Sequence, residues 1–115
     1  MIRKWYNAEE IIRSSEQEEN NRYGARKVFQ RKEYSIYRAG DGFIIHNTNG
    51  EFVKHHTHIR SFKKAKSIVD LCIRKKLPDK PNIWEIESLM RLTRNNAYYN
   101  QLRDLLERLE RDYDS

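Results

Sequence analysis

The sequence has few of the residues that form covalent cross-links, phosphate-cradling loops or membrane spans. Its 115 residues include one cysteine, Cys72, so an intramolecular disulfide is excluded. Its four glycines fall at expected turns, which leaves no glycine-rich loop to cradle a phosphate. The N-terminus MIRKWYNAEE lacks the apolar stretch of a signal peptide, and no apolar run approaches the length of about eighteen residues that a membrane span needs. These absences predict a cytoplasmic protein that does not enter a membrane.

Motifs for catalysis and metal binding are also missing. The sequence contains no G-x-S-x-G, H-E-x-x-H or C-x-x-C pattern, and the apolar neighbours of Cys72 favour a buried thiol. His55, His56 and Thr57 spell H-x-T, which resembles the phosphate-holding motif of two-histidine phosphoesterases, but the second copy that those enzymes need is absent. His56 and His58 form an H-x-H pair, and two ligands do not complete a metal site. We therefore expect no catalytic residue, no metal and no cofactor, and interpret the protein as a non-enzyme.

Positive charge, in contrast, is plentiful and unevenly distributed. The formal net charge of +6 divides into −2 for residues 1–20, +4 for 21–34, +1 for 35–61, +5 for 62–80 and −2 for 81–115. Charge that served only solubility would be spread evenly. The basic middle of the chain therefore favours a surface that faces a polyanion.

Hydrophobic periodicity predicts one α+β domain over residues 1–115. Residues 1–27 are expected to form an N-terminal helix, capped by Asn7 with Glu10 three positions on, and a basic connector. From Val28 the period changes to two, and the GDG at 40–42 and NG at 49–50 are hairpin signals. This pattern predicts a three-stranded antiparallel β-meander, whose central strand at 43–47 is expected to be partly covered on both faces.

Three further segments predict helices. Ser61 can cap a helix over residues 61–76 that covers the sheet and completes the unit 28–77. Residues 82–113 are expected to form two C-terminal helices, the first beginning at Asn82 and including Trp84, Ile86 and Leu89 on its apolar positions, with a break near residues 95–96. The predicted order is one helix, three strands and three helices.

The opening of the covering helix is the main candidate for a binding site. Lysines there would meet the helix amides that already favour anions, and histidines of the preceding strand could add donors whose contribution grows as the pH falls through about 6.5. Alternation makes Tyr37 the exposed sheet aromatic and a candidate for stacking on bases. The competing interpretation is an ordinary solvated helix face. The predicted nucleic-acid-binding residues are His56, His58, Arg60, Lys63, Lys64, Lys66 and Tyr37.

The last helix offers an alternative, a protein interface. Its apolar residues exceed what a narrow core stripe requires, so it could capture a protein, as a regulator or inhibitor of a host enzyme would, or form a homodimer. Under this interpretation nucleic acid is not the partner. The predicted interface residues are Tyr98, Tyr99, Leu102, Leu105, Leu106 and Leu109.

Residues 34–77 carry a resemblance to known proteins. Their segments GDGFIIHNT, HTHI and SFKKAKSIVDL resemble a group of small uncharacterised proteins from Gram-positive bacteria and their phages or mobile elements. That resemblance implies an origin and no activity.

The expected topology is also similar to double-stranded RNA-binding domains, in which lysines such as those of KKAK bridge phosphates, and to the arm-type DNA-binding domain of phage integrases. The chain departs from the RNA-binding family in lacking the alanine-rich final helix and in adding two helices.

Overall fold

The chain folds into an antiparallel sheet followed by helices. The structure, a computed structural model, describes residues 26–51 and 54–114. Within them the strands are β1 (Arg26–Arg31), β2 (Tyr34–Ala39), β3 (Gly42–Asn47) and β4 (His56–Ile59), and the helices are α2 (Phe62–Arg74), α3 (Ile83–Leu92) and α4 (Asn96–Asp114). The predicted α+β class is confirmed. The predicted N-terminal helix lies outside the described residues.

The sheet has four strands in the order β1-β2-β3-β4, so the predicted three-stranded meander is wrong in strand number. The missed feature is the turn at Lys32 and Glu33, which separates β1 from β2. Lys32 adopts φ 53°, a left-handed conformation that glycine and asparagine favour. Because the turn contains neither glycine nor asparagine, the period-two pattern continues through it without a visible break. The fourth strand also departs from the three-stranded sheets of the two domain families with a similar expected topology.

Both faces of the central strands are covered. Tyr34 and Ile36 face the helices, while Tyr37 and Ile44, which pair across β2 and β3, point to the opposite face. Tyr37 is only 3% exposed, so the prediction that its ring is available for stacking is wrong. Alternation assigns residues to faces, but it does not say which face meets solvent. The predicted coverage of 43–47 on both faces is confirmed, since Ile44 and Ile45 are both fully buried.

Helix α2 begins and ends at clear local signals. The Ser61 hydroxyl accepts a hydrogen bond from the backbone N–H of Lys64 at 3.2 Å, which caps the first turn. Lys75 adopts a left-handed conformation and its N–H bonds back to the helix, which ends α2 before Pro78. The predicted covering helix is confirmed. Its buried residues are Ala65, Ile68, Val69 and Cys72.

The last two helices form a pair. Asn82 caps α3 by accepting the backbone N–H of Glu85 at 2.8 Å. Tyr98 and Leu102 of α4 are 1% and 0% exposed and belong to the hydrophobic core. The Tyr98 hydroxyl also donates to the Lys76 carbonyl at 2.6 Å, which ties α4 to the connection after α2. These two predicted interface residues are therefore structural, because a side chain enclosed by its own fold offers no surface to a partner.

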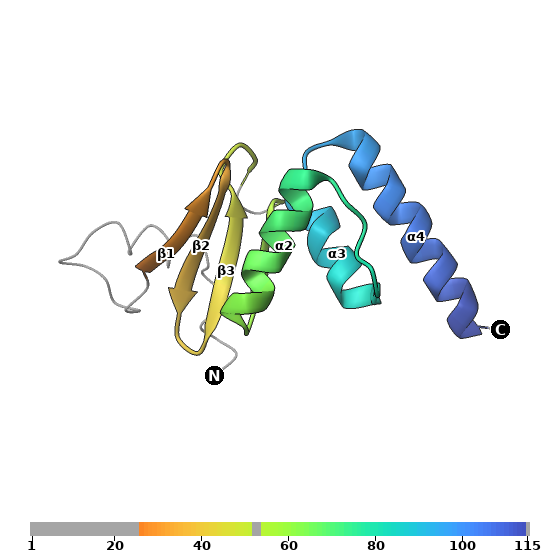
Figure 1. Ribbon diagram of the computed structural model, residues 1–115, viewed down its shortest axis with the longest axis horizontal. Coiled ribbons are helices and arrows are strands. Elements are labelled where there is room, and N and C mark those ends of the chain that lie inside the picture. Colours follow the sequence, from red (N-terminus) through yellow and green to blue (C-terminus); the bar gives the residue numbers. More distant parts are fainter. Residues whose placement is uncertain (1–25, 52–53, 115) are drawn as a thin grey trace.

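The elements stack in layers, with the sheet on one side, α2 and α3 next to it, and α4 outermost (Figure 1). Helices α2 and α3 both begin at the lower end of the view, the end at which the turn between β2 and β3 also lies (Figure 1). The N-termini of the two helices therefore share one end of the molecule. The core between the layers is formed by Tyr34, Ile36, Ile45, Ile59, Ala65, Ile68, Val69, Cys72, Ile86, Leu89, Leu92, Tyr98 and Leu102.

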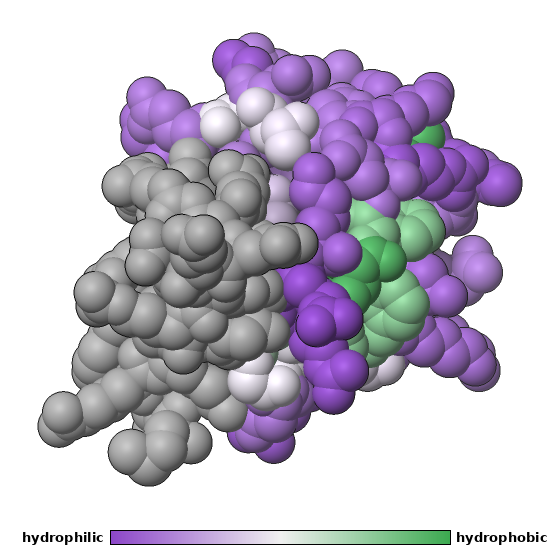
Figure 2. Space-filling view, turned by 90° about the vertical axis from the view of Figure 1, so that its left-hand side faces the viewer, coloured by the Kyte–Doolittle hydropathy of each residue, from purple (hydrophilic) through white to green (hydrophobic). Residues whose placement is uncertain are grey.

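A row of partly buried aromatic rings extends this core toward the surface. The rings of Phe43 and Phe62 stack at 5.3 Å between centroids, and Phe29 meets Phe62 edge-on at 6.2 Å. Figure 2 shows the β1 side of the molecule, where an apolar area is bordered by hydrophilic residues. We call these three rings the aromatic row.

Asn47 makes the main buried polar contact between the sheet and the helices. Its side chain is 2% exposed at the end of β3, and its amide donates to the carbonyl of Leu92, the last residue of α3, at 2.8 Å. Its side-chain oxygen accepts the N–H of Asn49 at 3.0 Å. One buried amide thereby satisfies both a helix end and the turn after the strand.

Replacing this residue by Asn47→Ala should lower the free energy of unfolding by about 1–3 kcal/mol, because the buried Leu92 carbonyl loses its donor. Urea denaturation measures the change. Asn49→Ala is the matched control, since this exposed asparagine lies two positions on and its loss should stay within about 0.5 kcal/mol. Equal losses in the two variants would contradict the role assigned to Asn47.

Candidate nucleic-acid interface

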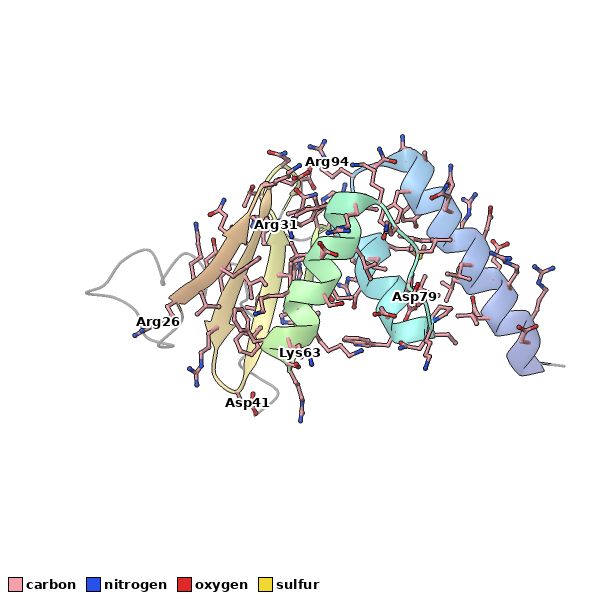
Figure 3. The ribbon with its side chains drawn as sticks, in the orientation of Figure 1. Arg26, Arg31, Asp41, Lys63, Asp79 and Arg94 are labelled. Atoms are coloured by element: carbon pink, nitrogen blue, oxygen red, sulfur yellow. The ribbon has the colours of Figure 1, made fainter. Side chains whose placement is uncertain are left out.

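A cavity lies where β4 ends and where α2 and α3 begin. Its volume is about 440 Å³. Figure 3 labels Lys63 at this end of α2. Five of the lining residues lie within 58–64, from the end of β4 to the start of α2, and the sixth comes from α3, twenty residues further on: His58, Ile59, Arg60, Ser61, Lys64 and Trp84. We call it the helix-end cavity.

The helix-end cavity has a positive wall. Arg60 and Lys64 are exposed, and neither forms an ion pair with a carboxylate of the described residues. The first turn of α2 contains no acidic residue, so the positive end of its dipole is not neutralised locally. Backbone amides and two cationic side chains thus act on the same space, which suits an anion.

The predicted phosphate-binding residues do not all meet there. The structure brings His58, Arg60 and Lys64 together on the cavity wall. Lys63 is exposed on α2 but does not line the cavity. Lys66 lies on another side of α2, with its Nζ 4.7 Å from the centroid of the Phe62 ring in the aromatic row. His56 does not line the cavity, and its ring lies edge-on to that of His58, with 5.0 Å between the centroids.

Ile59, Ser61 and Trp84 line the cavity but are not among the predicted binding residues, and Trp84 is the only aromatic residue among the lining residues. Trp84 is 44% exposed, although hydrophobic periodicity groups it with the apolar residues of its helix. A signal was present, because helical spacing of about 100° per residue places Trp84 nearly opposite Ile86, which is fully buried. The sequence alone does not say that α2 and β4 lie beside that exposed face.

The His58 side chain has an unusual titration. Burial, together with the nearby His56 and Arg91, lowers the pKa of His58 to about 4. The ring is therefore neutral at physiological pH and brings no charge to the cavity, and its Nδ1 atom is buried. An increase in binding as the pH falls through about 6.5 is not expected from this histidine in the free protein.

The remaining basic segments do not converge on the helix-end cavity. Arg31 of β1 and Arg74 of α2 both bind the carboxylate of Asp70, at 3.2 and 3.0 Å. Figure 3 shows Arg26, Arg31 and Arg94 at sites well apart from Lys63. Much of the net charge is thus distributed around the molecule, and part of it is paired.

Other chemistries find little support in the described part of the chain. Burial raises the pKa of the Cys72 thiol to about 12, so this cysteine stays protonated and unreactive at neutral pH. Residues 26–51 and 54–114 hold no group of three or more His, Cys, Asp or Glu side chains placed to bind a metal ion. No helix within these residues is both long enough and apolar enough to cross a bilayer.

Comparison with protein-family models, with curated proteins and with solved structures found no match.

The lowered pKa of His58 predicts a pH-dependent stability. Unfolded histidine takes up a proton near pH 6.5, whereas folded His58 does so only near pH 4, so stability is lost as the pH falls between these values. We expect a loss of about 1–2 kcal/mol between pH 7 and pH 4.5, allowing for the water that still reaches the half-buried ring.

Urea unfolding at the two pH values, in the wild type and in His58→Gln, checks this expectation. The variant should lose less stability than the wild type on acidification. If both proteins lose the same amount, His58 does not carry the effect.

Proposed function

We propose that this protein binds nucleic acid, without catalysis, through the helix-end cavity and the exposed lysines beside it. The observation that carries the proposal is the meeting of Arg60, Lys64 and the N-terminus of α2 around one recess that also contains an exposed tryptophan. Phosphate needs positive charge and directed N–H donors, and this end of the molecule supplies both.

The absence of competing carboxylates from the cavity wall supports the proposal. The one acidic residue in the first turn of α3, Glu85, is 7% exposed and does not line the cavity. An incoming phosphate therefore meets two cationic side chains without a fixed negative charge on the wall. Non-catalytic binding is the simplest activity for this wall, since its one hydroxyl, that of Ser61, already caps α2.

The number of cations sets the expected strength of binding. Arg60, Lys63 and Lys64 can contact about three phosphates, which corresponds to a slope of roughly −2 to −3 in a plot of log affinity against log salt concentration. Sequence-independent binding of this kind has dissociation constants of about 10⁻⁴ to 10⁻⁶ M at physiological salt. We expect this protein to fall in that range.

Charge reversal tests the site directly. Arg60→Glu/Lys64→Glu should weaken binding of a fluorescein-labelled oligonucleotide by at least about tenfold and reduce the salt slope by about 2, because two phosphate contacts are lost. Fluorescence anisotropy at several salt concentrations, with single- and double-stranded DNA and RNA, measures both quantities.

Arg103→Glu/Arg108→Glu is the matched control for charge. Both arginines are exposed on α4, and their reversal changes the net charge by the same amount at residues that do not line the helix-end cavity. This control should weaken binding only slightly. Equal losses in the two double variants would show a general charge effect and refute the cavity as the site, and an absence of binding by the wild type would refute the function.

A second candidate function is the capture of a protein partner through α4, as a phage or mobile-element regulator of a host enzyme would do. One observation favours it: a cavity of about 910 Å³ includes Met90 of α3 and Tyr99 and Leu106 of α4 among its lining residues. Tyr99 is 37% exposed. Leu105, Leu106 and Leu109 are only partly buried, because α4, with 19 residues, is longer than α3, with 10.

Under this alternative, Leu106→Asp should abolish self-association or partner capture and leave nucleic-acid binding unchanged. Light scattering coupled to gel filtration reports self-association, and anisotropy reports nucleic-acid binding. Gln101→Asp, on the exposed side of the same helix, is the control for added charge. A wild type that is monomeric and that captures no protein of the cell in which it occurs would exclude this function.

A further inference from the structure

Trp84 is an exposed aromatic residue on the wall of the helix-end cavity. No aromatic ring of the described residues contacts its indole, in contrast to the phenylalanines of the aromatic row. The buried face of α3 is formed by other residues, and 44% of the Trp84 side chain is exposed beside the helix-end cavity. A large apolar ring left open next to cations is suited to stacking on a base.

One wall of the cavity is apolar and another is positively charged, which matches the two parts of a nucleotide, an apolar base face and a negatively charged phosphate. Ile59 and Trp84 supply apolar surface, while Arg60, Lys64 and the N-terminus of α2 supply positive charge. His58, neutral at physiological pH, adds a polar ring without charge. A base against the apolar wall would therefore have its phosphate beside the positive one.

The size and shape of the cavity favour an unstacked base over a duplex. A volume of about 440 Å³ falls within the range of about 300–1,000 Å³ that is typical of sites for small ligands. In a duplex the faces of the bases are stacked on one another, so an aromatic ring in a protein recess can stack on a base only if that base leaves the stack. Single strands present their bases without that cost.

We propose that the helix-end cavity accepts one unstacked base of single-stranded nucleic acid, stacked on Trp84, with the adjoining phosphate held by Arg60, Lys64 and the first turn of α2. This inference rests on the proposed function, since it names the ligand class of the same cavity. It assigns affinity to two separable sources: phosphates, which any strand supplies, and a base, which only an unpaired strand presents.

An abasic oligonucleotide separates these sources. It carries the same number of phosphates as a decathymidine strand but no bases. Anisotropy should show that the wild type binds decathymidine about 5- to 150-fold more tightly than the abasic decamer, the range expected for one stacked base. Trp84→Ala should remove this preference and retain the salt slope, and Trp84→Phe should keep part of it.

Tyr99→Ala is the matched control, because Tyr99 is a similarly exposed aromatic residue on α4, away from the helix-end cavity. It should leave the preference intact. Quenching of tryptophan emission by decathymidine in a Trp5→Phe background, where Trp84 is the one remaining indole of the sequence, gives an independent signal. The thermal midpoint of each variant confirms that folding is retained.

The outcomes separate the two proposals. Equal affinity for the two decamers, with a salt slope that Arg60→Glu/Lys64→Glu reduces, would overturn base stacking and leave phosphate binding in place. Retention of the full preference for decathymidine by Trp84→Ala would also overturn it. A failure to bind either decamer would refute the proposed function itself.

Discussion

The arrangement of the helices on the sheet depends on the buried side chain of Asn47. An amide enclosed by apolar residues must find partners, and Asn47 finds them in the Leu92 carbonyl and the Asn49 N–H. Its bond to Leu92 fixes the last turn of α3 at the end of β3. A second contact, from the Thr57 hydroxyl to the Ser88 hydroxyl at 3.3 Å, lies nearer the middle of the same helix. Because a helix is stiff, these two contacts also determine where Trp84, near its first turn, is located.

The same arrangement gives one end of the molecule its positive character. Helices α2 and α3 begin at that end, each capped by a side-chain oxygen, from Ser61 and from Asn82. Each cap satisfies one amide of its first turn and leaves the dipole in place. The packing that stabilises the core thus places the N-terminus of α2, whose first turn has no acidic residue, beside Arg60 and Lys64, whereas Glu85 offsets the dipole in the first turn of α3.

Local signals in the sequence were enough to predict part of this structure. The caps at Ser61 and Asn82 and the apolar spacing behind them predict α2 and α3, because capping and helical periodicity depend on residues within a few positions of each other. The turn at Lys32 was not predicted, because a lysine in the left-handed conformation cannot be recognised from the sequence in the way that a glycine or an asparagine can. The prediction that Tyr37 is exposed was wrong, because the covering of the second sheet face depends on tertiary packing, which period-two alternation does not encode.

In the candidate site too, residues close together in the sequence could be grouped in advance, whereas contacts between distant residues could not. His58, Arg60 and Lys64 could be grouped from the sequence because they are separated by only a few residues, and the structure places all three on one wall. Lys66 is only two residues from Lys64, yet it lies over Phe62 on another side of the helix. Trp84 is twenty residues from Lys64 and shares its cavity. The total of basic residues is therefore a poor guide to a binding site, since Asp70 pairs with Arg31 and Arg74 while Arg60 and Lys64 stay available to a ligand. If the proposed function holds, position relative to a helix end and to an exposed aromatic ring, more than net charge, would decide where the polyanion binds.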